Sequence, residues 1–424
     1  MLIQFTVSNY RSFREPQTLS MVASKALRSK RKENTISPGT SEKGLPSLLR
    51  CAAVFGPNAS GKSNLVKALQ FTERMVMHSA GADDEEAIDV QPFRLNRETS
   101  QEDSSFEIEF IEEDVRYQFG FTANEDRITS EWLICYPRAR PQQLYRRRFD
   151  EEAKRDEYDF GAQLEGGRLR KDWASQTGPK TLYISRVVQA SSQEFQQLRI
   201  PAKWFTRRLR VSPLGSTVFN GSPTSKLCET PEGLAKVIEF LNSFDLPIVG
   251  IEIAKKPFDV EGISKLFSKD GMEQVFRGRL PDEIRELSFT IDQTTVPEVK
   301  FKASEESSGT LNLVGFAAKW IDVVEKDWIL VVDELDSSLH PLVVWELIRK
   351  LTETESKAQL IFTTHDATVL RSKLLRRDQV FFVAPDKKRA SHLYSLFDFK
   401  GREDDAFEDR YLQGRYGATP KLVR

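Results

Sequence analysis

The chain has 424 residues, enough for two or three domains, and its composition excludes several classes of protein. Lysine and arginine number 62 against 63 aspartates and glutamates, so the overall charge does not indicate binding to nucleic acid or membranes. The 3 cysteines are widely spaced and fit neither a disulfide framework nor a zinc site, and no apolar run approaches the ~20 residues that cross a bilayer. We therefore expect a soluble, cytoplasmic protein.

The N-terminal segment predicts a strand, a loop and a second strand. Residues 2–9 alternate between apolar and polar side chains, which is typical of a half-buried strand and unlike a signal peptide. Residues 24–47 are polar and basic with Gly and Pro, and they predict a loop. Residues 51–55, CAAVF, predict a buried strand.

A phosphate-binding loop follows this strand. Its G-x-x-x-x-G-K-[ST] pattern is made by Gly56, Pro57, Asn58, Ala59, Ser60, Gly61, Lys62 and Ser63, with Asn64 next in the chain. Glycines let successive backbone N–H groups point at one anion, and a helix beginning near Lys62 adds its positive end. In this pattern Lys62 reaches the β- and γ-phosphates and Ser63 ligates Mg²⁺. The alternative is a glycine-containing turn before any helix, but the flanking strand and helix favour a bound nucleotide.

The next segment predicts antiparallel strands and then changes in character. Residues 105–121 form two alternating runs around an acidic turn, which predicts a hairpin, and residues 131–136 could add a strand beside it. From 137 to 300 the chain is dense in charge of both signs, with a helical pattern over 231–244. We assign this range to an inserted arm subdomain.

Two basic clusters lie in the arm range. Residues 137–149 and 204–210 interleave arginines with aromatic residues, which would suit phosphate neutralisation and base stacking. A charged arm balanced by the acidic residues that follow, or one that meets a protein partner, fits the pattern as well. Direct contact with nucleic acid therefore stays open.

The α/β pattern returns after residue 301, with apolar strands predicted at 328–333, 359–363 and 379–384. The first of these ends in Asp333 and Glu334, at the edge where ligands bind in open α/β sheets. Asp333 is placed to hold Mg²⁺ through water, and Glu334 could act as the general base that polarises the attacking water. A strand that ends in a solvated acidic turn is the alternative, and the phosphate loop in the same chain favours the catalytic interpretation.

Two further motifs point to the same chemistry. His365 follows the strand predicted at 359–363 and could sense the γ-phosphate or position water, although a structural hydrogen bond is the simpler alternative. Ser307, Ser308 and Gly309 precede an apolar helix and could form an anion site at its N-terminus, or an ordinary helix cap.

These patterns predict an α/β fold. We expect a P-loop core built from both ends of the chain, with an antiparallel β subdomain and an inserted arm. The expected division is an N-terminal ATPase lobe at 1–136, the arm at 137–300 and a C-terminal ATPase lobe at 301–424.

The order of these elements resembles ABC-type ATPases of the SMC/RecF class, and within them the AAA15, or RloA-like, family of bacterial defence ATPases. The resemblance is carried by MLIQFTVSNYRSF, AAVFGPNASGKSN, PFRLN, EWL, ESSGT, VVDELDSSLHP, TTHD and YLQGRYGATP. It spans both ends of the chain and is thinnest over 140–300. The coiled coil of SMC proteins is missing, because the sequence has no sustained heptad run.

The resemblance implies roles for particular residues. Ser307, Ser308 and Gly309 would belong to the signature motif, which in ABC-type dimers contacts the γ-phosphate held by the other subunit. Residues 336–340 would form the D-loop, and His365 would be the switch histidine. Gln91 is the candidate for the Q-loop glutamine at the metal.

The resemblance also implies a function. We expect an Mg²⁺-dependent ATPase that serves as the sensor or switch of an anti-phage, abortive-infection system, through ATP-dependent closure of a homo-oligomer. A separate effector protein from the same operon, RloB-like or another nuclease or toxin, would be its partner, and a phage protein its trigger. The alternative is a RecF/SMC-like DNA-repair ATPase that acts directly on DNA. Because only 59 residues follow His365, we expect no nuclease domain of ~100 residues beyond the remaining core strands of this sequence.

Overall fold

The chain divides into two compact units. The computed structural model describes residues 1–424 except 29–30, 41, 43, 82–84, 190–194, 214–221, 258–282, 292–298, 337–338, 372–373, 403–404 and 421–424. The first unit comprises Met1–Gly215, Val323–Ser337 and Val344–Arg424, and the second comprises Ser216–Asp322 and Ser338–Val343. Both ends of the sequence therefore contribute to the first unit.

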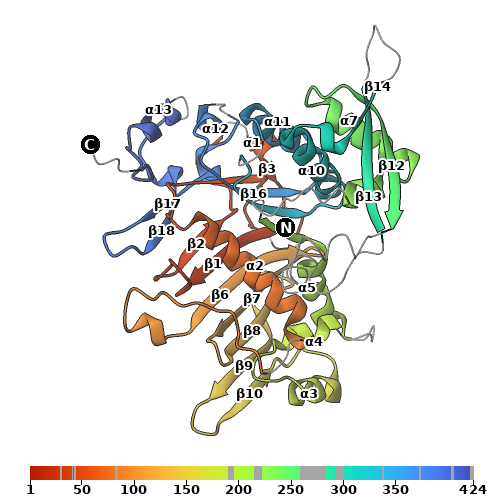
Figure 1. Cartoon of the computed structure of the whole chain (residues 1–424). Coiled ribbons are helices and arrows are strands. Elements are labelled where there is room, and N and C mark those ends of the chain that lie inside the picture. Colours follow the sequence, from red (N-terminus) through yellow and green to blue (C-terminus); the bar gives the residue numbers. More distant parts are fainter. Residues whose placement is uncertain are drawn as a thin grey trace. The chain divides into compact units, whose positions relative to one another are not determined.

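An antiparallel sheet forms one layer of the first unit (Figure 1), with strand order β10-β9-β8-β7-β6-β1-β2. Its strands are β1 Leu2–Ser8, β2 Gln17–Ser20, β6 Ser104–Glu112, β7 Val115–Ala123, β8 Ile128–Tyr136, β9 Gln142–Asp150 and β10 Arg155–Phe160. Glu113 and Asp114 join β6 to β7 with φ of 46° and 60°, which is the backbone of a tight two-residue hairpin turn. The hairpin predicted around 112–114 is confirmed, and so is the strand beside it.

A second sheet carries the phosphate loop. Its strand order is β11-β15-β16-β5-β17-β18, parallel except for the last strand. The strands are β5 Cys51–Phe55, β11 Leu209–Pro213, β15 Ile329–Asp333, β16 Gln359–Thr364, β17 Val380–Pro385 and β18 Ser391–Ser395. Every residue of β5 and β16 is buried, as expected of parallel strands covered on both faces. The carboxyl ends of β5, β16 and β15 therefore meet at one edge.

Helix α2, Lys62–His78, packs between the two sheets of this unit (Figure 1). Its buried face includes Leu65, Val66, Leu69 and Phe71, at the spacing of an amphipathic helix. These side chains join residues of both sheets in one hydrophobic core. The core therefore fixes the first turn of α2, which follows the phosphate loop directly in the chain.

The remaining elements are shorter. The α-helices are α1 Arg31–Asn34, α3 Gly167–Ser175, α4 Tyr183–Gln189, α5 Gln196–Arg207, α11 Pro341–Glu353, α12 Thr368–Arg371 and α13 Phe407–Leu412. Strands β3 Thr35–Ile36 and β4 Leu48–Leu49 form a two-stranded sheet, so the predicted loop over 24–47 contains α1 and β3. Across the described ranges, no helix is long and apolar enough to cross a membrane.

The second unit holds a three-stranded antiparallel sheet in the order β12-β13-β14. Its strands are β12 Ile248–Pro257, β13 Glu283–Ile291 and β14 Val299–Lys302, and its helices are α6 Ser222–Leu227, α7 Pro231–Asn242 and α10 Ser308–Glu325. The hydroxyl of Thr230 accepts from Gly233 N at 3.1 Å and caps α7, whose first residue is Pro231. The helical pattern predicted at 231–244 is thus confirmed.

The structure does not divide the chain at residue 137 as the sequence analysis expected. Strands β9 and β10 extend the antiparallel sheet beyond 136, and β11 is an edge strand of the parallel sheet. Glu131 on β8 accepts hydrogen bonds from Tyr145 Oη at 2.7 Å and from the backbone N–H groups of Tyr183 and Ile184 at 2.7 and 3.0 Å. Residues 137–215 therefore belong to the first unit, and the inserted unit begins near 216.

Candidate nucleotide site

The phosphate loop connects β5 to α2 as the sequence predicts. Two glycines are required by close neighbours: a Cβ on Gly56 would lie 2.3 Å from Val383 O, and one on Gly61 would lie 2.3 Å from Ser391 Oγ. Gly61 also has φ of 109°, in the region that favours glycine. The loop is thus held tightly against β17 and β18, while Asn58 and Ala59 at its tip are exposed.

Lys62 occupies the first turn of α2 and is 5% exposed. Its Nζ donates to the carbonyl oxygens of Gly56 and Pro57 at 2.8 and 3.2 Å. Burial lowers the pKa of Lys62 to about 8, although Glu334, Asp333 and Asp336 oppose this shift. The ammonium is therefore oriented into the loop, where a phosphate oxygen could replace a carbonyl.

The two acidic residues at the end of β15 are positioned by Thr363 of the adjacent strand β16. Its hydroxyl donates to Asp333 Oδ1 at 2.7 Å and accepts from the backbone N–H of Glu334 at 2.7 Å. Glu334 has φ of 52°, which turns the chain out of the strand direction. Asp333 and Glu334 are both half-buried, so their carboxylates remain accessible to a ligand.

His365 connects the lysine to the acidic pair. It follows β16, and its Nδ1 lies 3.5 Å from Lys62 Nζ while its Nε2 lies 3.7 Å from Glu334 Oε1. When Nδ1 accepts from the ammonium, the ring proton is on Nε2 and faces the carboxylate. The structure thus brings together three residues that are widely separated in the sequence.

The predicted magnesium ligands fit the oxygen chemistry of that ion. Mg²⁺ in nucleotide sites uses one or two protein oxygens together with substrate phosphates and water. Ser63 is half-buried in the first turn of α2, Asp333 ends β15, and Asp336 Oδ1 is buried without a hydrogen-bond partner among the described residues. Over those same residues no group of three or more His, Cys, Asp and Glu side chains forms a metal cluster.

Gln91 lies on a segment that contacts the N-terminal turn. Its backbone oxygen accepts from Arg11 N at 2.7 Å. Ser12 follows Arg11 in the chain. Its Oγ accepts from Asn64 Nδ2 at 2.8 Å, and its backbone oxygen accepts from Ser391 N at 2.7 Å. Gln91 is therefore linked through this turn to the start of α2, and its role as a metal ligand stays a prediction.

Ser307, Ser308 and Gly309 begin α10 in the second unit and are exposed. Ser307 Oγ accepts from Thr310 N at 3.1 Å, so it caps the helix. A Cβ on Gly309 would meet only Ser307 Oγ, at 3.7 Å. The capping role is observed, whereas contact with a γ-phosphate remains a prediction.

Comparison with known protein families shows to which family the chain belongs. Residues 51–171 and 230–371 match the sequence model of the family described as "AAA domain, putative AbiEii toxin, Type IV TA system". The chain belongs to this family. The family match and the observed topology confirm the predicted α/β P-loop ATPase fold with its antiparallel β subdomain. Among curated proteins, none matches the sequence.

The chain is also similar to structures of SMC heads. The SMC head domain from Thermotoga maritima is 16% identical, with a TM-score of 0.39 over 93% of this chain and 98% of that one. An SMC head bound to the C-winged helix domain of ScpA is 12% identical, with a TM-score of 0.40 over 93% and 97% of the two chains. An SMC head from Pyrococcus furiosus, bound to the C-terminal domain of ScpA, is 12% identical, with a TM-score of 0.37 over 93% and 96%.

Sequence reasoning missed three residues that shape the site. Thr363 was detectable in principle, because a hydroxyl in a fully buried strand needs a partner. Ser12 and Ser391 could not be found, since each is one of many serines and only folding brings them to within contact of Gly61.

Proposed function

We propose that this chain is an ATP-hydrolysing sensor or switch subunit of a bacterial anti-phage, abortive-infection system, acting in the cytoplasm on a separate effector protein. One observation carries the catalytic part of the proposal: His365 lies between Lys62 and Glu334, 3.5 and 3.7 Å away, at the carboxyl ends of adjacent parallel strands. The family description, which names a toxin system, supports the biological part. Within this family the motifs favour an ABC-type, AAA15 or RloA-like member.

The residues divide the work of hydrolysis between binding and proton transfer. Lys62 exchanges its contacts with Gly56 O and Pro57 O for phosphate oxygens, and the N-terminus of α2 adds positive potential. Glu334 accepts the proton of the attacking water, and His365, whose Nε2 faces the Glu334 carboxylate, helps to position that water. Ser63 and Asp333 would hold Mg²⁺, with Gln91 as a third candidate, and the ion would neutralise charge on the phosphates.

Hydrolysis would serve as a conformational switch. ATP closes two copies of the chain, so that Ser308 and Gly309 of one copy meet the nucleotide held by the other, and hydrolysis releases them. The effector would recognise one of these two states. A homo-oligomer and an effector of toxin or nuclease type are therefore the proposed partners, and a phage protein the proposed trigger.

Turnover of ATP by matched variants tests the catalytic assignment. Glu334→Gln should keep nucleotide binding and lose turnover by about 10²-fold or more, because it removes the general base and keeps the shape. The control is Glu346→Gln, a carboxylate that pairs with Arg349 on α11. Normal turnover by Glu334→Gln would remove Glu334 from the mechanism.

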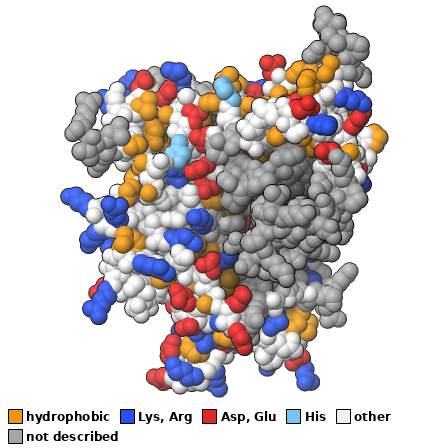
Figure 2. All heavy atoms as spheres, in the orientation of Figure 1, with side chains coloured by type: hydrophobic (Ala, Val, Ile, Leu, Met, Phe, Trp, Pro, Cys, Tyr) orange, Lys and Arg blue, Asp and Glu red, His pale blue; other side chains and the backbone are white. Residues whose placement is uncertain are grey.

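The DNA-repair alternative predicts a different result. In the basic stretch 137–149 one arginine is structural, because Arg147 is fully buried and donates to Thr181 O, Gly178 O and Asp156, whereas the other four arginines of the stretch are exposed. In the face of the molecule shown in Figure 2, basic and acidic side chains are interspersed over the described part. ATP turnover that rises with DNA and falls steeply with salt would favour the repair function.

A further inference from the structure

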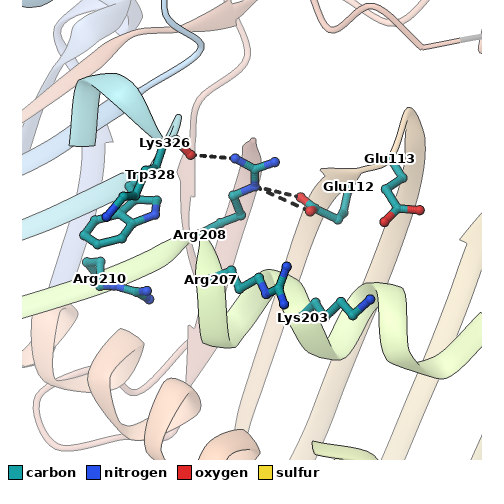
Figure 3. A pocket seen from close by; sticks show the side chains of 8 residues that line it. All are labelled: Glu112, Glu113, Lys203, Arg207, Arg208, Arg210, Lys326 and Trp328. Carbon is teal, nitrogen blue, oxygen red and sulfur yellow. Dashed lines mark hydrogen bonds and ion pairs between the residues drawn. The ribbon is translucent and has the colours of Figure 1, made fainter. Parts of the chain in front are cut away.

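A basic pocket lies in the first unit, away from the nucleotide site (Figure 3). It has a volume of about 460 Å³ and is lined by Glu112, Glu113, Lys203, Arg207, Arg208, Arg210, Lys326 and Trp328. Four elements supply these residues: the turn between β6 and β7, the end of α5, the start of β11 and the segment before β15. Five cations against two carboxylates leave an excess of three positive charges in the lining.

Two of the arginines are held in place by neighbours. Arg208 Nε lies 3.3 Å from Glu112 Oε2, and its Nη1 donates to Lys326 O at 2.6 Å. The Arg210 guanidinium lies 4.2 Å from the ring centroid of Trp328, and its Nη1 donates to Leu209 O at 2.7 Å. A guanidinium stacked on an aromatic ring keeps a fixed plane, which suits recognition of a flat or forked oxyanion. These contacts preorganise one wall of the pocket.

Lys203 and Arg207 form the opposite wall, and within the described part of the chain their side chains lack contacts of the kind that hold Arg208 and Arg210. They lie one turn apart on α5, whose other face buries Leu198, Trp204 and Phe205 in the core. Neither side chain has a hydrogen bond or ion pair with any residue that the structure describes. Both are directed toward the pocket in Figure 3. Two cations are thus presented at one site without the carboxylates that offset Arg208.

We propose that this pocket binds a small phosphate-bearing molecule of about nucleotide size, at a site separate from the phosphate loop. The volume lies in the ~300–1,000 Å³ range of small-molecule pockets. A ligand with two or three negative charges would neutralise the surplus in the lining, with Lys203 and Arg207 as its direct partners. The stacked Arg210 would supply an oriented guanidinium to the same group.

The location separates this site from the catalytic one. Lys326 and Trp328 precede β15, whereas Asp333 ends it. Five residues of extended strand span on the order of 16 Å, so the pocket and the phosphate loop lie at opposite edges of the sheet. One phosphate-bearing molecule of this size cannot fill both sites.

Binding of inorganic pyrophosphate and ADP, measured by calorimetry, tests the proposal. All chains carry Lys62→Ala, which weakens ligand binding at the phosphate loop. The binding that remains is then compared between chains with and without Lys203→Glu and Arg207→Glu. We expect the paired charge reversal to lower affinity about tenfold or more, because it replaces two direct cationic partners by repelling carboxylates. The matched control is Lys25→Glu with Arg28→Glu, the same charge change at two exposed cations of the same unit.

The controls separate this proposal from its competitors. Thermal unfolding reports whether the charge reversal disturbs folding. If it does, the milder pair Lys203→Ala with Arg207→Ala replaces it, and we expect this pair to lower the affinity for pyrophosphate as well. Equal affinity in all chains would overturn the proposal. Displacement of pyrophosphate by a single-stranded oligonucleotide, with affinity that grows with its length, would also overturn it and assign the pocket to nucleic acid. None of these readouts uses ATP turnover, so the outcome is independent of the proposed function.

Discussion

At the scale of single residues, Thr363 determines how the two carboxylates at the end of β15 are presented. Thr363→Val keeps the shape of the side chain but removes the donor to Asp333 and the acceptor for Glu334 N. Leaving a buried group without its partner costs about 1–3 kcal/mol. In this variant, we expect the cost to appear as a less well-defined orientation of Asp333 and Glu334. We expect kcat for ATP to fall several-fold with little change in KM.

Thr72→Val is the control for that substitution. Thr72 is also buried, but its hydroxyl donates only to Ala68 O within α2. Steady-state kinetics of both variants separate the two roles. If Thr363→Val and Thr72→Val changed kcat equally, the positioning role of Thr363 would be wrong.

We expect Lys62 to make nucleotide binding depend on pH. Burial lowers its pKa to about 8, so the lysine is charged below pH 8 and progressively neutral above it. Affinity for ATP should therefore fall as the pH rises through 8, and binding above that pH should take up a proton. Lys62→Arg, which stays charged, should show no such dependence between about pH 7 and 9.5. Calorimetry in buffers of different ionisation enthalpy measures both effects.

The positions of the candidate site residues were largely predictable, because each belongs to a recognisable sequence motif. The P-loop pattern predicted Lys62 and the fold of the loop, and the acids after an apolar strand predicted Asp333 and Glu334 at the sheet edge. The approach of His365 to both Lys62 and Glu334 was not predictable in detail. It depends on the strand order β15-β16-β5, which the sequence does not state.

At the scale of elements, the β17–β18 hairpin supports the phosphate loop. Ser391 Oγ donates to Ser60 O at 2.5 Å, and Ser391 N donates to Ser12 O at 2.7 Å. Ser391→Ala should loosen the loop and raise KM for ATP about three- to tenfold, since one hydrogen bond contributes about 0.5–1.5 kcal/mol. The control is Ser395→Ala in the same strand, whose hydroxyl contacts Arg377 O and Val380 O. An unchanged KM in Ser391→Ala would contradict the supporting role.

Regular elements followed their sequence patterns closely. The apolar run at 51–55 became β5, the hairpin formed around Glu113 and Asp114, and the strand predicted at 359–363 became β16. Short-range periodicity is sufficient for such segments. The pairing of Ser391 with Ser60 joins positions 331 residues apart, and no local pattern carries that information.

At the scale of the whole molecule, the division of the chain was predicted least well. The dense charge after 137 indicated an exposed arm, but half of that range completes the first unit. Arg147 and Glu131 explain the error, because both are buried charged side chains whose partners lie far along the chain. Composition alone cannot distinguish a buried, paired arginine from a solvated one.

Glu131→Ala tests this integration. The substitution leaves Tyr145 Oη and the backbone N–H groups of Tyr183 and Ile184 without their acceptor. We expect a loss of several kcal/mol in the free energy of unfolding, measured from urea titration, because unsatisfied buried donors cost about 1–3 kcal/mol each. Glu151→Ala, at an exposed carboxylate paired with Lys154, should change little. Equal stability of the two variants would mean that residues 137–215 are not integral to the first unit.

The most direct test of the switch is the mass in solution of the Glu334→Gln chain, with and without ATP·Mg²⁺. Blocked hydrolysis should trap the closed state, so the account predicts a nucleotide-dependent shift to a dimer or larger assembly, absent when Lys62→Ala is added. Adding the protein encoded beside this chain should show a complex that ATP forms or breaks. A mass that stays the same under all of these conditions, while ATP still binds, would contradict ATP-dependent closure.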